Sequence, residues 1–175
     1  MTKLATFLTA CLLLCAVHGK PGYKKETECK RGSVTKVLAA LQKETYYLTG
    51  TTNTTREPCY FLSSQGLNGM PVSGTPVMYG YIRGDGERVY ITEGVAEQKD
   101  EKFQKKRRFP SNLGGPLKGK KVAIQGHNCF VLYLKDEIEL WVENPIVDTS
   151  TCCSWTFDKL RKERQYKTTY EHGVC

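Results

Sequence analysis

The most regular pattern in the chain covers residues 129–142, on both sides of a turn at Lys135-Asp136. On each side of this turn, every second residue belongs to one series of side chains and the residues between them belong to another. Because successive side chains of a strand point to opposite faces, this pattern predicts a β-hairpin whose two faces lie in different environments. Glu139 and Trp141 fall on the same face. A carboxylate beside a tryptophan is unusual on a solvated surface, and it favours the inside of a barrel that holds a ligand.

The rest of the chain predicts two helices and further strands. Ser33 is a suitable N-cap for apolar residues at helical spacing, which predicts a short helix over 33–42, and a second helical pattern covers 156–166. Runs of β-forming residues between turn sequences, and one charged run bracketed by Phe, predict strands at 46–49, 59–62, 76–82, 88–93, 100–109 and 121–124. Residues 166–175 are predicted to form an extended tail.

Together these elements predict an all-β fold class, an eight-stranded antiparallel barrel with a short N-terminal helix and a C-terminal helix. About eight strands is the number at which a barrel closes around one small ligand. A β-sandwich with a packed core is the alternative. The apolar strand residues would look the same in a packed core and in a ligand-binding wall.

The first residues predict a secretory leader. Lys3 precedes an apolar run over 4–17, and Gly19 ends a stretch that a signal peptidase would accept. We therefore predict a signal peptide over 1–19 and one secreted domain over 20–175. The apolar run is too short and too early for a membrane anchor, and a retained signal anchor is the alternative.

Six of the eight cysteines remain after this leader, which predicts a disulfide framework in a secreted chain of this size. Cys152 and Cys153 are adjacent, and a bond between neighbours strains the peptide that joins them, so we expect them to reach two different elements. A zinc site would need Cys-x-x-Cys or His spacing that the chain lacks, so no metal is expected.

Charge and motifs exclude several functions. The precursor carries +8, and loss of Lys3 leaves 25 basic and 18 acidic residues, or +7, which favours anionic partners. We find no Ser-His-acid constellation, phosphate loop or metal spacing, so neither an enzyme nor a cofactor is expected. Nucleic acid is not an expected partner, because no recognition module is present, and neither is a membrane.

Three surface motifs stand apart from the barrel. Asn53-Thr54-Thr55 is an N-glycosylation sequon that is expected to face water when it is used. Arg83-Gly84-Asp85 is an integrin-recognition tripeptide at a predicted hairpin tip, although Gly-Asp is also ordinary turn chemistry. The basic run over 105–108 suits a heparin-like or lipid partner, or a solvated edge strand.

Taken together, the cysteine order and several short motifs give the whole mature chain a family resemblance. The residues concerned are Lys36-Val37-Leu38, Tyr46-Tyr47-Leu48, Cys129, Glu139-Leu140-Trp141, Cys152-Cys153 and Cys175. With them the chain resembles the tick salivary lipocalins, the histamine-binding and moubatin-like proteins. The resemblance implies the pairs Cys29–Cys152, Cys59–Cys175 and Cys129–Cys153. It also implies that the chain sequesters a host mediator, such as histamine, serotonin, a leukotriene or thromboxane, or binds a host protein such as complement. We expect the chain to be a monomer.

The residue after Cys129 favours one of these ligands. The resemblance implies Asp at this position in amine binders, whereas this chain has Phe130. An eicosanoid needs an apolar wall and a basic mouth. We expect the ligand-binding wall to consist of the apolar residues Tyr46, Val77, Tyr79, Tyr81, Phe130, Leu132 and Trp141, with Glu139 as its one polar position. Anionic head-group contacts are expected from Arg107, Lys118 or Lys120.

The sequence is also compatible with two other kinds of partner. An amine would use Glu139 and Trp141 as its anion and aromatic face. A protein-binding decoy would act on integrin or complement. Glu139 also has a purely structural interpretation, a salt bridge to an arginine of the strand predicted over 100–109, because an unpaired buried carboxylate is costly.

Overall fold

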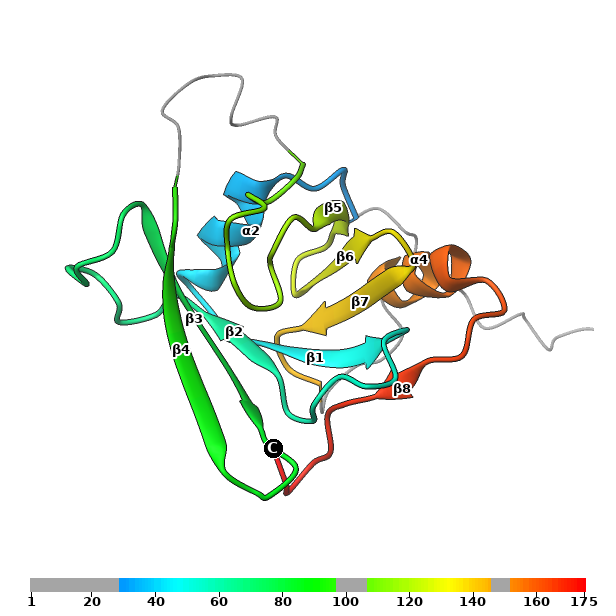
Figure 1. Ribbon diagram of the computed structural model, residues 1–175. Helices are drawn as coiled ribbons and strands as arrows, with labels where there is room; N and C mark the ends of the chain where they lie inside the picture. Colours follow the sequence, from blue (N-terminus) through cyan, green and yellow to red (C-terminus); the bar gives the residue numbers. More distant parts are fainter. Residues whose placement is uncertain (1–28, 97–106, 146–151) are drawn as a thin grey trace, which may run out of the picture.

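The computed structural model describes residues 29–96, 107–145 and 152–175, and the leader predicted over 1–19 lies outside them. The described residues form two helices and one eight-stranded sheet (Figure 1). The elements are α2 (Val34–Leu41), β1 (Tyr46–Thr51), β2 (Phe61–Ser63), β3 (Thr75–Ile82), β4 (Arg88–Val95), β5 (Lys121–Gln125), β6 (Cys129–Leu134), β7 (Glu137–Val142), α4 (Cys152–Arg161) and β8 (Lys167–Thr168). Neither of these helices is long and apolar enough to cross a membrane.

The sheet is antiparallel, and its strands follow the order β4-β3-β2-β1-β7-β6-β5, with β8 paired to β1. It curves around an interior, and within the described residues its two end strands, β4 and β5, do not pair with each other (Figure 1). The predicted all-β barrel-like fold with a helix near each end of the chain is confirmed.

The strand predicted over 100–109 is not one of the eight. Residues 97–106 lie outside the described part of the chain, and the residues that follow make a single antiparallel bridge to β5, between Arg108 and Lys121. The eighth strand is instead β8, in the tail. β2 pairs only with the first residues of β1, so the same edge of β1 is available from Gly50 onwards. β8 pairs with β1 there.

Two predicted boundaries differ from the structure for local reasons. β2 begins at Phe61 because Cys59 has φ +59°, a left-handed conformation that interrupts a strand. α4 begins at the vicinal cysteines and ends before Lys162, which has φ +55°, whereas the sequence predicted a helix over 156–166. The bounds of the helix therefore differ from the prediction, but its apolar face at Cys153, Phe157 and Leu160 is the predicted one.

Apolar side chains fill the inside of the curved sheet. α2 lies against this interior, and its buried face joins side chains from most of the strands (Figure 1). The buried interior includes Val34, Val37, Leu38, Leu41, Leu48, Leu62, Val77, Val122, Phe130, Leu132 and Trp141. Each such side chain contributes about 1.5–3 kcal/mol when it is fully buried, so this cluster is the main core of the fold.

A second apolar cluster covers the outer face of the β6–β7 hairpin, under α4. Its buried members are Cys129, Val131, Ile138, Val142, Cys153 and Phe157. The two series predicted for the hairpin therefore point into two different cores, with Glu139 and Trp141 on the inner side. Burial of both faces explains why the strands of this hairpin contain few polar residues.

Three disulfides tie the ends of the chain to the barrel: Cys29–Cys152, Cys59–Cys175 and Cys129–Cys153. These are the pairs that the resemblance implies, and the vicinal cysteines reach two different elements. Cys29 Sγ lies 3.9 Å from Cys153 Sγ, so two of the bridges pack together. The four sulfur atoms of the Cys29–Cys152 and Cys129–Cys153 bridges are all bonded to another sulfur, so none of them is a thiolate that could bind a metal. Several disulfides indicate an extracellular protein.

Candidate functional site

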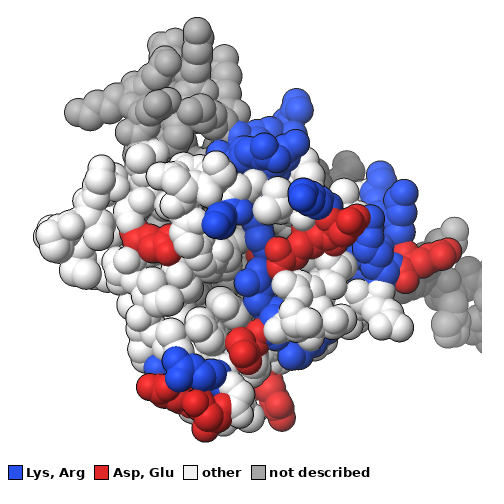
Figure 2. All heavy atoms as spheres, in the orientation of Figure 1, with Lys and Arg blue, Asp and Glu red and all other residues white. Residues whose placement is uncertain are grey.

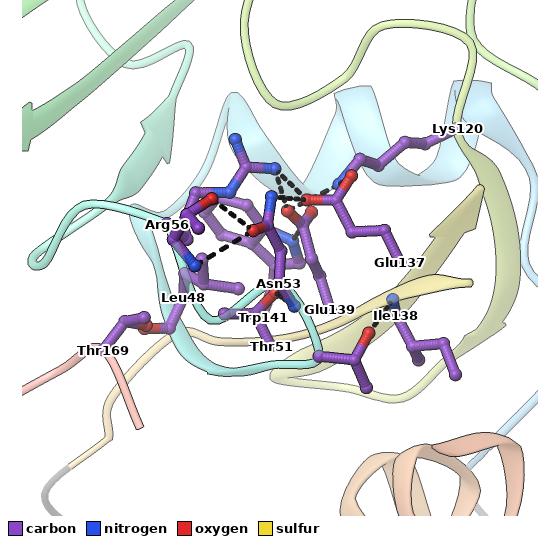
Figure 3. Close-up of polar contacts among 12 residues, drawn as sticks. Leu48, Thr51, Asn53, Arg56, Lys120, Glu137, Ile138, Glu139, Trp141 and Thr169 are labelled. Atoms are coloured by element: carbon purple, nitrogen blue, oxygen red, sulfur yellow. Dashed lines mark hydrogen bonds and ion pairs between the residues drawn. The ribbon is translucent and has the colours of Figure 1, made fainter. Parts of the chain in front are cut away.

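Glu139 lies at the centre of a buried ion-pair cluster, which consists of Arg56, Lys120, Glu137 and Glu139 (Figure 3). The Glu139 side chain has no exposed surface, and its Oε1 lies 2.5 Å from both Arg56 Nη2 and Lys120 Nζ. Trp141 Nε1 donates to the other carboxylate oxygen at 3.1 Å. Both oxygens of Glu139 are therefore occupied by donors of the protein itself.

Glu137 forms the outer half of the cluster. Its carboxylate lies 2.6 Å from Arg56 Nη2 and 3.1 Å from Lys120 Nζ, and Asn53 Nδ2 donates to it at 3.1 Å. Burial alone would raise the pKa of Glu137, but Lys120 and Arg56 outweigh it and hold the pKa below its usual value. Burial lowers the pKa of Arg56, yet Glu139 and Glu137 more than compensate and raise it.

The lowered pKa gives a pH dependence that can be measured with Glu137→Gln. A carboxyl with a depressed folded pKa stabilises the fold above its unfolded pKa, about 4.3, and this contribution is lost as the pH falls through the folded pKa. We expect Glu137→Gln to cost about 1–2 kcal/mol of unfolding free energy at pH 7. The cost should shrink steadily below about pH 4. Urea denaturation of both proteins from pH 3 to 7 measures it, and a cost that is independent of pH would contradict the ion-pair assignment.

A cavity of about 890 Å³ opens beside the cluster. Its charged lining consists of five cations, Arg56, Arg107, Arg108, Lys118 and Lys120, and one carboxylate, Glu137. Apolar surface comes from Ala96, Phe109, Pro110 and Leu134. On the face shown in Figure 2, Lys and Arg side chains gather near carboxylates in the middle of the molecule. We call this space the cationic cavity.

The predicted head-group residues all line the cationic cavity, but they differ in availability. Lys118 is exposed, whereas Lys120 is buried and paired with Glu139 and Glu137. The Arg107 Nη2 donates to two backbone carbonyls of β5, at 2.9 and 2.8 Å. The buried Nε atoms of Arg56 and Arg107 have no hydrogen-bond partner within the described residues, so each is a donor that a ligand oxygen could satisfy.

The predicted apolar wall does come together, as part of the packed core. Tyr46, Val77, Tyr79, Phe130, Leu132 and Trp141 belong to one buried cluster, with Tyr81 packed against it. The rings of Tyr46 and Trp141 lie 4.9 and 6.1 Å from the ring of Phe130. A cavity beside Val77 and Tyr79 measures only about 10 Å³, about the size of one water molecule. Whether these residues contact a ligand remains a prediction.

Tyr79 reaches a carboxylate at the rim of that small cavity. Its hydroxyl donates to Glu93 Oε1 at 3.1 Å, and Glu93 Oε2 accepts from Gly114 N–H at 2.9 Å. Burial and the charge of Glu93 raise the pKa of Tyr79 to about 12. This pair fixes the loop after residue 109 against β3 and β4.

Arg56 belongs to the site although no pattern in the sequence predicts it. The structural interpretation of Glu139 required an arginine from 100–109, but its partners are Arg56, from the loop between β1 and β2, and Lys120. Only the sequon and a proline mark this loop in the sequence, and neither indicates an inward-pointing charge. The sequon was expected to face water when it is used; in the structure Thr54 and Thr55 are exposed, whereas Asn53 is half-buried and its Nδ2 donates to Glu137.

The Arg83-Gly84-Asp85 tripeptide lies at the exposed tip of the β3–β4 hairpin, as predicted. Arg83 Nη1 lies 2.6 Å from Glu87 and 3.7 Å from Asp85, and Asp85 Oδ1 accepts from Glu87 N–H at 3.0 Å. The charged groups of the tripeptide are thus paired within the turn. Of the basic run over 105–108, only Arg107 and Arg108 lie within the described residues.

Comparisons with known proteins identify the fold. No protein-family model matches the chain, and no curated protein matches it. A crystal structure of an AM182–serotonin complex is similar to it, with a TM-score of 0.60 and 20% sequence identity over 83% of this chain and 94% of that chain. This similarity and the curved antiparallel sheet show that the chain has a lipocalin-like β-barrel fold.

Proposed function

We propose that this chain is a secreted salivary lipocalin that sequesters a small host inflammatory mediator, an eicosanoid such as a leukotriene or thromboxane. The lipocalin-like fold supports a small ligand, and the disulfides support an extracellular site of action. The proposal includes secretion through the leader predicted over 1–19 and membership of the tick salivary lipocalins, which the chain resembles.

The charge of the cationic cavity is the observation that carries the proposal. Five cationic side chains and one carboxylate line a space of about 890 Å³, and three of these cations, Arg107, Arg108 and Lys118, lie outside the ion-pair cluster. The apolar surface of the cavity comes from the residue after β4, the end of β6 and the residues before β5, not from the wall that the sequence predicted. Eicosanoids combine an apolar chain with a carboxylate, which basic side chains bind through charge-assisted hydrogen bonds. The volume lies within the usual range for small-molecule sites, about 300–1,000 Å³.

An amine mediator is the second candidate, because the structurally similar AM182 was solved with serotonin. Glu139 would be the natural partner for its ammonium group. In this chain, however, Arg56 and Lys120 already neutralise Glu139, and Trp141 bonds its second oxygen. An ammonium would have to replace one of these buried cations and would meet repulsion from the other, so the geometry favours the eicosanoid.

Titration calorimetry with leukotrienes, a thromboxane analogue, serotonin and histamine tests the proposal. We expect about one site for an eicosanoid, and about tenfold weaker binding for Lys118→Gln combined with Arg108→Gln, because two charge-assisted contacts are lost. Arg88→Gln is the control, since Arg88 is exposed on β4 and does not line the cavity. Tighter binding of serotonin or histamine than of any eicosanoid would establish the amine function instead.

A further inference from the structure

The side chain of Asn53 lines the cationic cavity and is fixed by hydrogen bonds. Its Nδ2 donates to Glu137 Oε1 at 3.1 Å, and its Oδ1 accepts from the backbone and hydroxyl of Thr55 at 3.1 and 2.8 Å. Figure 3 shows its amide pointing towards Arg56 and Glu137. The nitrogen that an N-linked glycan would use therefore points towards the ion-pair cluster.

Glycosylation of this nitrogen would change the cavity directly. A transferase joins Nδ2 to C1 of a sugar carried on a lipid diphosphate; Nδ2 loses one hydrogen as a proton, and the diphosphate leaves with the electrons of the broken C1–O bond. The modified amide keeps one N–H. Because Nδ2 lies 3.1 Å from Glu137, the gap between them is too narrow for a sugar ring. The first sugar must therefore lie over the cavity mouth or push the loop outwards.

We propose that Asn53 is a modification site whose glycan covers the cationic cavity, so that the glycosylation state of the chain sets access for its anionic ligand. The identity of that ligand rests on the function proposed above. Two features of the chain support this proposal: Asn53-Thr54-Thr55 is a sequon, and Asn53 is a lining residue of the cavity. A population with partial occupancy would contain an open form and a covered form of the same barrel.

The test compares three proteins secreted from a glycosylating eukaryotic host. They are the unchanged chain, Thr55→Ala, and Thr55→Ala with Met70→Thr. Thr55→Ala removes the sequon and the hydroxyl bond to Asn53 Oδ1, but it leaves both residues of the Asn53–Glu137 hydrogen bond and the Thr55 backbone bond to Asn53 in place. Met70→Thr creates a sequon at Asn68, an exposed residue that does not line the cavity, and so moves the same glycan elsewhere. Intact mass spectrometry measures the fraction of chains that carry a glycan. Fluorescence titration with 1-anilinonaphthalene-8-sulfonate, an anionic aromatic probe, measures access to the cationic cavity.

We expect the glycosylated unchanged chain to bind the probe at least tenfold more weakly than Thr55→Ala, and the protein with the relocated glycan to match Thr55→Ala. An unmodified wild-type chain, equal affinities, or weak binding by all three proteins would each overturn the inference. A parallel titration with a leukotriene separates the two proposals. If Thr55→Ala binds the probe but no mediator, the proposed function fails and the covered cavity still stands.

Discussion

Glu139→Ala will lower the free energy of unfolding by about 3–5 kcal/mol, the cost of removing one partner from a buried ion pair. The Glu139 side chain is fully buried and Lys120 is almost so, with 3% of its side chain exposed. Without this carboxylate, Lys120 keeps only the more distant Glu137 oxygen at 3.1 Å, and the indole of Trp141 loses its acceptor. Equilibrium denaturation in guanidinium chloride at pH 7 measures the loss.

Two further variants separate charge from packing. Glu139→Gln keeps the size and an acceptor for Trp141, so its cost isolates the lost charge. Glu139→Leu combined with Lys120→Met removes the two most buried members of the cluster and leaves Arg56 paired with Glu137, and apolar pairs of similar volume are often neutral in such sites. We therefore expect the double variant to be more stable than Glu139→Ala by about 2 kcal/mol or more. A double variant no more stable than Glu139→Ala would contradict the assignment of the loss to an unpaired Lys120.

The hairpin shows how far local pattern determines the site. The alternation over 129–142 placed Glu139 and Trp141 on the inner face, and the structure has them there. The pattern sufficed because a one-residue change of register would move every side chain of the strand to the other face. The alternation could not predict whether the interior is a packed core or a ligand-binding wall, because Phe130 would occupy the same position in both.

Arg56 shows why the rest of the site could not be predicted. Its partners lie more than 80 residues away in the sequence, at separations of 81 and 83 for Glu137 and Glu139. No periodicity connects a polar loop to a distant strand, and only the pairing of β1 with β7 brings them together. The same limit applies to β8, because its place on β1 depends on where β2 stops pairing.

Removal of the Cys59–Cys175 disulfide is the second change with a large expected effect. The bridge joins residues separated by 116 positions, and the chain-entropy model assigns about 4.7 kcal/mol to a loop of roughly 100 residues. It also holds the tail where Cys59 N–H donates to Thr169 O at 2.9 Å. We therefore expect Cys59→Ala with Cys175→Ala to lose about 4–5 kcal/mol of unfolding free energy. Hydrogen exchange at Thr169 should accelerate more than exchange within β6.

A glycine variant provides the matched control for this disulfide. Cys59 has φ +59°, a conformation that costs a residue with a Cβ about 1–2 kcal/mol and costs glycine little. Cys59→Gly with Cys175→Ala lacks the same bridge but relieves this strain, so it should be more stable than the alanine pair by about 1 kcal/mol. Denaturation under matched conditions compares the two. If both variants remain within about 1 kcal/mol of the unchanged protein, the hydrogen bonds of β8 and Thr169 hold the tail without the disulfide.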